Sequence, residues 1–127
     1  MLILAYAETE TMKAVRFVGS SLDDLRALPR QAQKDIGFAL FEAQLGGKSY
    51  FAKPLKGFKG AGVLEVVENF DGDTYRAVYT VKFADVVYVL HCFQKKSTKG
   101  IATPKQTIEL IKKRLQQAAA IHQAKEQ

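Results

Sequence analysis

Three consecutive runs rich in β-branched and aromatic residues constrain the fold of this chain more than any other feature. The runs cover 63–70, 74–83 and 86–93. Asp71-Gly72 separates the first two runs and is typical of a two-residue hairpin turn, because both residue types tolerate positive φ. Ala84-Asp85 makes a second short connection. The pattern predicts three antiparallel neighbouring strands whose alternate side chains point to opposite faces of a sheet.

The segment before these strands has the pattern of one strand followed by two helices. Alternation over 13–18 predicts the strand, and Ser21-Leu-Asp-Asp24 resembles a capping box that begins a helix. Pro29 is expected to divide the helical stretch by opening a second helix, which Gly46-Gly47 then ends. The apolar stripe of this stretch comprises Leu25, Leu28, Ala32, Ile36, Leu40 and Ala43.

The C-terminal part has the pattern of one more helix. Thr103-Pro-Lys-Gln106 is a second capping box with proline at the first helical position. The apolar stripe behind it comprises Ile108, Ile111, Leu115 and Ala118. From about Ala119 the sequence turns alanine- and glutamine-rich and then polar, so we expect it to fray. The element order predicts an α+β fold in which helices cover one face of a mostly antiparallel sheet.

Length and composition favour one domain in the cytoplasm. The chain has 127 residues, and nearly half are apolar, so it can fold without disulfides or metals. Cys92 is the single cysteine, which excludes an intrachain disulfide and a Cys/His zinc site and fits a reducing compartment. The apolar run 1–7 is too short to span a bilayer and lacks the pattern of a signal peptide. We place the domain at 13–118, with 1–12 as a lead or added strand and 119–127 as a tail.

The net charge of +6 is concentrated in two lysine-rich segments. Residues 43–64 and 94–108 each contain four lysines and no acid. Such segments are either ordinary solvated surface or a surface for nucleic-acid phosphates, and charge alone does not decide between them.

The second predicted helix carries a second apolar side, formed by Phe38, Phe41 and Leu45. Either the N-terminal segment or a partner chain covers it, because exposed apolar patches mark interaction sites.

Five short pieces of the sequence, in the order of the predicted elements, point to a known family. They are Lys53-Pro-Leu-Lys-Gly57, Gly62-Val-Leu-Glu65, Asp71-Gly-Asp-Thr-Tyr-Arg76, His91-Cys-Phe-Gln-Lys-Lys96 and Thr103-Pro104. As an ordered set, extending over about 13–115, they resemble the phage-derived branch of the RelE/ParE toxin superfamily, close to HigB. The resemblance implies a small α+β toxin neutralised by an antitoxin, here expected to be a helix-turn-helix protein. Most such toxins enter the ribosomal A site and cut mRNA, whereas a ParE-like minority inhibits DNA gyrase, and the shared fold does not choose between them.

The chemistry implied for an RNA-cleaving member is attack of a ribose 2′-hydroxyl on the adjacent phosphate, with no metal or cofactor. It needs cations on the phosphate, a group that removes the 2′ proton and a donor for the leaving oxygen. Arg76 is the first candidate for the phosphate, because a guanidinium matches two phosphate oxygens, and His91 and Lys96 are the candidates for acid–base chemistry. The expected phosphate-binding surface comprises Lys53, Lys56, Lys59, Lys95 and Lys99.

Each candidate also has a structural interpretation. Arg76, on one face with Val78 and Thr80, is alternatively a surface or salt-bridging arginine, and a single lysine is usually solvated. Alternation places His91 with Val87, Val89 and Phe93, where a histidine is more often structural. Cys92 alternates away from His91, which argues against a Cys/His nucleophile pair.

One position departs from the family pattern. Related toxins commonly carry a basic residue after Leu64-Glu65-Val66, where this chain has Val67. The departure is compatible with compensation by the lysines, a weak enzyme or binding module, or a gyrase-directed relative. Gly57, Gly60 and Gly62 follow no predicted strand and precede no predicted helix, so they form no nucleotide-binding loop.

Overall fold

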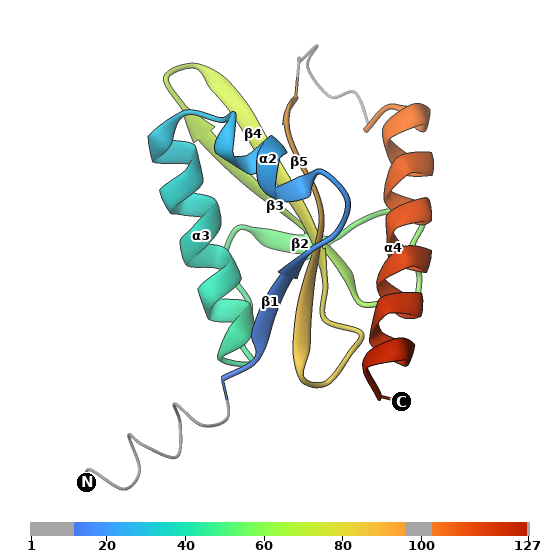
Figure 1. The fold of residues 1–127 in the computed structure, drawn as a ribbon. Coiled ribbons are helices and arrows are strands. Elements are labelled where there is room, and N and C mark those ends of the chain that lie inside the picture. Colours follow the sequence, from blue (N-terminus) through green and yellow to red (C-terminus); the bar gives the residue numbers. More distant parts are fainter. Residues whose placement is uncertain (1–11, 96–102, 127) are drawn as a thin grey trace, which may run out of the picture.

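The computed structural model describes residues 12–95 and 103–126, and their fold is α+β, as predicted (Figure 1). The elements are β1 (Ala14–Phe17), α2 (Ser21–Arg26), α3 (Arg30–Gln44), β2 (Ala52–Pro54), β3 (Val63–Phe70), β4 (Asp73–Thr80), β5 (Val86–Lys95) and α4 (Lys105–Glu126). They form one sheet with the strand order β1-β5-β4-β3-β2. Strand β1 is parallel to β5, and all other neighbours are antiparallel.

Helices cover both faces of the sheet, so the prediction of one covered face was wrong. Helix α3 lies on one side and α4 on the other (Figure 1). We call these sides the α3 face and the α4 face. Helices cover both faces because the side chains of the central strands are apolar on both sides of the sheet, so each side needs an element that buries it. The α3-face core includes Ile36, Leu40, Val66, Ala77, Tyr79, Val87 and Val89. The α4-face core includes Val63, Val78, Tyr88, Leu90, Ile111 and Ala118.

The meander has four antiparallel strands rather than the predicted three. The additional strand, β2, forms inside the first lysine-rich segment, where no strand was predicted, and pairs with β3. It is an edge strand, the position in a sheet that tolerates a proline such as Pro54. Strand β4 ends at Thr80 instead of reaching Phe83.

The predicted turn, the starts of α3 and α4 and the end of α3 are confirmed within one residue. Asp71 and Gly72 both have positive φ, 52° and 83°, as a two-residue hairpin turn of this type requires. Helix α3 begins directly after Pro29, and α4 directly after Pro104. Gly46, with φ 87°, follows the end of α3, where its N–H bonds to the carbonyl oxygen of Ala43.

Helix α4 continues through 119–126, where we expected a fraying tail. Tertiary contacts explain the difference, because His122 is buried. Its Nδ1 lies 3.0 Å from the Tyr88 hydroxyl, and its Nε2 lies 3.5 Å from a carboxylate oxygen of Asp85. Its ring packs on Phe83, with centroids 4.5 Å apart. The end of α4 is therefore anchored to the β4–β5 connection.

We expect His122→Ala to lower the free energy of unfolding by about 1–2 kcal/mol, because a buried hydrogen bond and a ring contact are lost. Urea denaturation measures this change. Gln123→Ala, at the exposed neighbouring position, is the control and should leave stability almost unchanged. Equal stability of the two variants would contradict the anchoring role.

Candidate functional site

Strand β5 contains one residue more than its partner β4 can pair. Tyr79 is opposite Val89, whereas Val78 is opposite His91, so Leu90 is the extra residue of a β-bulge. The expectation that His91 shares a face with Val87 and Val89 was wrong, because the bulge interrupts the alternation. His91 therefore lies on the α4 face. Bulges commonly redirect side chains beside functional sites.

The strand register gathers several predicted site residues on the α4 face. Residues directly opposite each other on neighbouring strands project from the same face. Arg76 is opposite Phe93 on one side and Val67 on the other. One row along, Val78 is opposite His91 and Glu65, and Glu65 is opposite Lys53 of β2. Arg76, His91 and Lys53 are thus brought to one end of one face.

Arg76 is held by a buried carboxylate. Its Nη1 donates to Oε2 of Glu65 at 2.8 Å, and the two side chains are 14% and 3% exposed. Arg76 is thus largely covered rather than emerging at the surface, and the salt-bridging alternative describes part of its role. Its buried Nε has no hydrogen-bond partner within the described part of the chain. An anion can therefore meet this guanidinium only through the part of the side chain that stays accessible, and not through the covered Nε.

His91 is part of a polar cluster that joins β5, α2 and α4. Its Nδ1 lies 3.2 Å from Nη1 of Arg114 and 3.5 Å from Oδ2 of Asp24. Its ring stacks on Phe93, with centroids 4.8 Å apart and 18° between the planes. Arg114 also donates to the carbonyl oxygen of Leu90 at 2.8 Å. Arg114 therefore fixes both the bulge and the imidazole that the bulge redirects.

The surroundings of His91 favour its neutral form. Burial and the neighbouring Arg114 charge lower the pKa of His91, against the opposing effect of Asp24. Nδ1 cannot accept a hydrogen bond from Arg114 and donate one to Asp24 at the same time. With the first partner, Nε2 of the neutral ring carries the proton and can only donate a hydrogen bond; with the second, Nε2 is free to act as a base. The contact with Asp24 is thus the arrangement in which His91 can act as a base.

Sequence reasoning missed four residues of the site, namely Ser20, Asp24, Glu65 and Arg114. The predicted first capping box was wrong, because Ser21 lies inside α2 and its hydroxyl donates to the carbonyl oxygen of Val89. Ser20 instead accepts from Arg114 Nη2 at 2.7 Å and donates to Asp24 at 3.0 Å. Two signals were present in the sequence. The hairpin turn sets Glu65 one row from Arg76, and Arg114 interrupts the apolar stripe of α4.

The predicted lysines are not all brought together. Lys53 is exposed on β2, opposite Glu65 and close to Arg76 in register. Lys56 and Lys59 are exposed in the β2–β3 connection, which leads into the start of β3. Lys95 ends β5, two residues beyond Phe93, and Lys96 and Lys99 lie outside the described residues. Of the predicted lysines that the structure describes, Lys53 on β2 and Lys95 on β5 therefore lie nearest to Arg76 in the sheet, one on each side of it.

Cys92 faces away from this site, as predicted. It belongs to the α3-face core, where burial raises the pKa of its thiol to about 12. A thiol in this state is no nucleophile at neutral pH. Within 12–95 and 103–126 no group of three or more His, Cys, Asp or Glu side chains is placed to hold a metal ion.

Two substitutions are expected to move the pKa of His91 in opposite directions. Arg114→Gln removes a nearby positive charge and should raise this pKa, whereas Asp24→Asn removes a negative charge and should lower it. Titration of the histidine ring signals by NMR measures both changes, with His122 in the same spectrum as an internal reference. A pKa of His91 that stays constant in both variants would contradict the described cluster.

A comparison with protein-family models agrees with the predicted branch. A family model described as Phage derived protein Gp49-like matches residues 23–116, inside the expected domain, and confirms the phage-derived branch. No curated protein sequence matches the chain. Among solved structures, a chain of the toxin-antitoxin complex RelBE2 from Mycobacterium tuberculosis is 23% identical, with a TM-score of 0.48; the match covers 66% of this chain and 99% of that one. Among the described helices, none is both long and apolar enough to cross a membrane.

Proposed function

This chain belongs to the Gp49-like family of phage-derived proteins, and from that premise we propose that it is the toxin of a toxin–antitoxin pair. In this proposal it acts in the cytoplasm as a ribosome-dependent endoribonuclease that cleaves mRNA. Its partners are the ribosome, the message and a cognate antitoxin. The observation that carries the proposal is the placement of Arg76 and His91 on one face, in adjacent rows of the sheet.

The proposed reaction is an in-line displacement at a phosphate of the message. His91, with Nδ1 bonded to Asp24, removes the proton of the 2′-hydroxyl through Nε2, and the 2′-oxygen forms a bond to phosphorus. Arg76 stabilises the charge that develops on the phosphate oxygens, in the orientation set by Glu65. The bond to the 5′-oxygen breaks, and a cation such as Lys96 protonates that oxygen. The products are a 2′,3′-cyclic phosphate and a free 5′-hydroxyl.

Further lysines extend this site in the proposal. Lys53 and Lys95 lie on the two sides of Arg76 in the sheet and bind the flanking phosphates of the message. Lys56, Lys59 and Lys99 contribute positive charge toward ribosomal RNA, whose phosphates dominate binding and make it salt-dependent.

A weaker or non-cleaving toxin is the second candidate, and the position of Val67 favours it. Val67 lies directly opposite Arg76 on the α4 face, so the basic residue that related toxins carry here would adjoin the guanidinium. This chain has one cation fewer at that point. A toxin of this kind would act on gyrase or bind its target without cutting it.

Primer extension on a reporter message in a purified translation system distinguishes the two candidates. Cuts at defined codon positions that require ribosomes are the result expected of the endoribonuclease. An intact message with well-folded protein would exclude that activity, and inhibition of supercoiling by DNA gyrase would then support the second candidate.

A further inference from the structure

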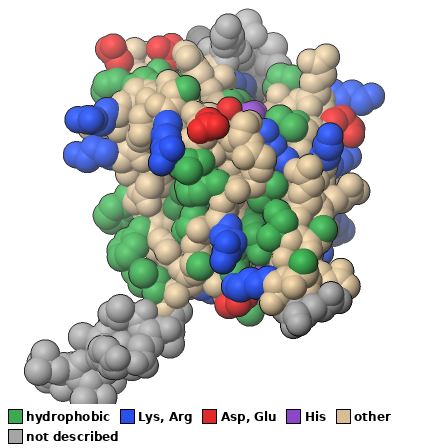
Figure 2. All heavy atoms as spheres, in the orientation of Figure 1, with side chains coloured by type: hydrophobic (Ala, Val, Ile, Leu, Met, Phe, Trp, Pro, Cys, Tyr) green, Lys and Arg blue, Asp and Glu red, His purple; other side chains and the backbone are tan. Residues whose placement is uncertain are grey.

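An exposed apolar patch lies on the α3 side of the molecule, away from Arg76 and His91. Phe38, Phe41 and Leu45 are 65%, 44% and 56% exposed, and their spacing places them on one stripe of α3. Tyr50 and Phe51, from the α3–β2 connection, are also exposed. We call these five residues the α3 patch. Figure 2 shows hydrophobic side chains gathered along the outer side of α3. Patches of this kind mark interaction surfaces.

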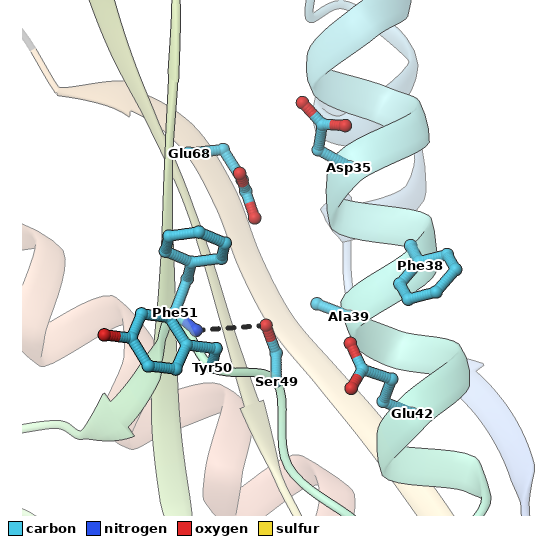
Figure 3. Close-up of a pocket in the computed structure, with 8 residues that line it drawn as sticks. All are labelled: Asp35, Phe38, Ala39, Glu42, Ser49, Tyr50, Phe51 and Glu68. Atoms are coloured by element: carbon cyan, nitrogen blue, oxygen red, sulfur yellow. Dashed lines mark hydrogen bonds between the residues drawn. The ribbon is translucent and has the colours of Figure 1, made fainter.

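The patch borders a hollow of about 240 Å³ between α3, the α3–β2 connection and β3. Figure 3 shows Phe38 and Glu42 on the helix side and Phe51 and Glu68 on the opposite side. The N–H of Phe51 donates to the hydroxyl of Ser49 at 3.2 Å, and this bond fixes the α3–β2 connection where it lines the hollow. The hollow lies along the apolar stripe and can receive side chains of a helix that packs there.

The hollow is acidic, although the whole chain is basic. Three of its eight lining residues are the carboxylates Asp35, Glu42 and Glu68, and none is a lysine or arginine. Burial and the charge of Asp35 both raise the pKa of Glu68. A partner that brings lysine or arginine to this rim gains charge complementarity as well as apolar contact.

The N-terminal segment and a second copy of the chain both fit this rim poorly. Hydrogen bonds between Lys13 and Gln44 place the start of the described chain at the end of α3, within reach of Leu45. Residues 1–11, however, contain Glu8 and Glu10 and no basic residue, so their charge would repel the rim. A two-fold pairing of α3 patches would set the same carboxylates against each other.

We propose that the α3 patch is the docking surface for an amphipathic helix of a partner protein, with an apolar stripe bordered by lysine or arginine. Since the assignment of this partner rests on the proposed function, it is the antitoxin. The helix places its apolar side chains on Phe38, Phe41 and Leu45 and its cations beside Glu42 and Glu68. The patch lies across the sheet from Arg76, so docking and cleavage can be disrupted separately.

The probe is a synthetic helical peptide with a leucine stripe flanked by lysines, and its match carries glutamates at the flanks. Calorimetry with the full chain should detect binding of the lysine peptide. The chain should bind the glutamate peptide at least about 10-fold more weakly. Phe38→Ala and Glu42→Gln should each weaken binding about 10-fold, and added salt should weaken it further. Lys112→Ala, exposed on α4, is the matched control and should change nothing.

Several results would overturn the docking proposal. Equal binding of the two peptides, or unchanged binding in Phe38→Ala, would show that the acidic apolar patch is not the site. Binding only after removal of residues 1–11 would assign the patch to that segment, and a dimer in sedimentation that Phe38→Ala dissociates would assign it to a second copy. Message cleavage is measured in parallel and should be unchanged in Phe38→Ala. If the wild type binds the peptide but does not cleave the message, the nuclease proposal fails and the docking proposal stands.

Discussion

Replacing the ion pair with Glu65→Gln/Arg76→Gln is expected to reduce message cleavage about 10³-fold, because it removes the cation from the phosphate. The double variant is preferable to Arg76→Ala, which would leave the Glu65 carboxylate buried without its partner and cost about 3 kcal/mol of stability. Two amides can still hydrogen-bond at this position, so the fold should persist. Single-turnover cleavage of ribosome-bound message measures the loss, and thermal unfolding checks the fold.

Glu65→Gln alone is the matched control for this experiment. It keeps the guanidinium and one hydrogen bond, so cleavage should stay within about 10-fold of the wild type. Undiminished cleavage by the folded double variant would remove Arg76 from the proposed chemistry. Equal losses in the single and double variants would assign the effect to orientation by Glu65 rather than to the positive charge.

His91→Gln is expected to reduce cleavage about 10²-fold, the usual contribution of a positioned base. A base acts in its neutral form, and the pKa of His91 lies below the ordinary value of 6.5. Wild-type cleavage should therefore be constant near neutral pH and fall as pH decreases through this pKa. The variant should lack that acidic decline. Rates across this pH range, measured with pre-formed ribosome complexes, provide the comparison.

Gln94→Ala, at an exposed neighbouring position of β5, should keep both the rate and the pH profile. A wild-type rate that instead falls as pH rises would assign His91 the role of acid in its protonated form, in which Nδ1 also carries a proton and faces Asp24. Wild-type activity in His91→Gln would leave the histidine a structural role only.

The hairpin and the helices were predictable because their signals are local. Asp71-Gly72 fixes both the turn and the β3–β4 register, and from that register alone Glu65 falls one row from Arg76. The pairing of β1 with β5 depends on residues more than seventy positions apart, which local patterns do not record. Edge strand β2 is only three residues long and contains Pro54, so its composition indicates a loop.

The placement of His91 was not predictable for a different reason. Residues Val86 to Leu90 are all buried, so the first half of β5 has no alternation from which a face can be assigned. Nothing in that run reveals the extra residue. The polar cluster around His91 was equally hidden, because Ser20, Asp24 and Arg114 come from elements that meet only in the folded chain.

The bulge in β5 decides which side chains reach the site. An unbroken ladder continued from the Tyr79–Val89 pair would set His91 opposite Ala77 and Phe93 opposite Tyr75, and the α3-face core would have to accommodate an imidazole. The bulge absorbs Leu90, so the side chains after it keep the faces that a regular strand one residue shorter would give them. A one-residue change of length in β5 therefore leaves the site intact where a bulge absorbs it, and removes several of its side chains at once where the register shifts instead.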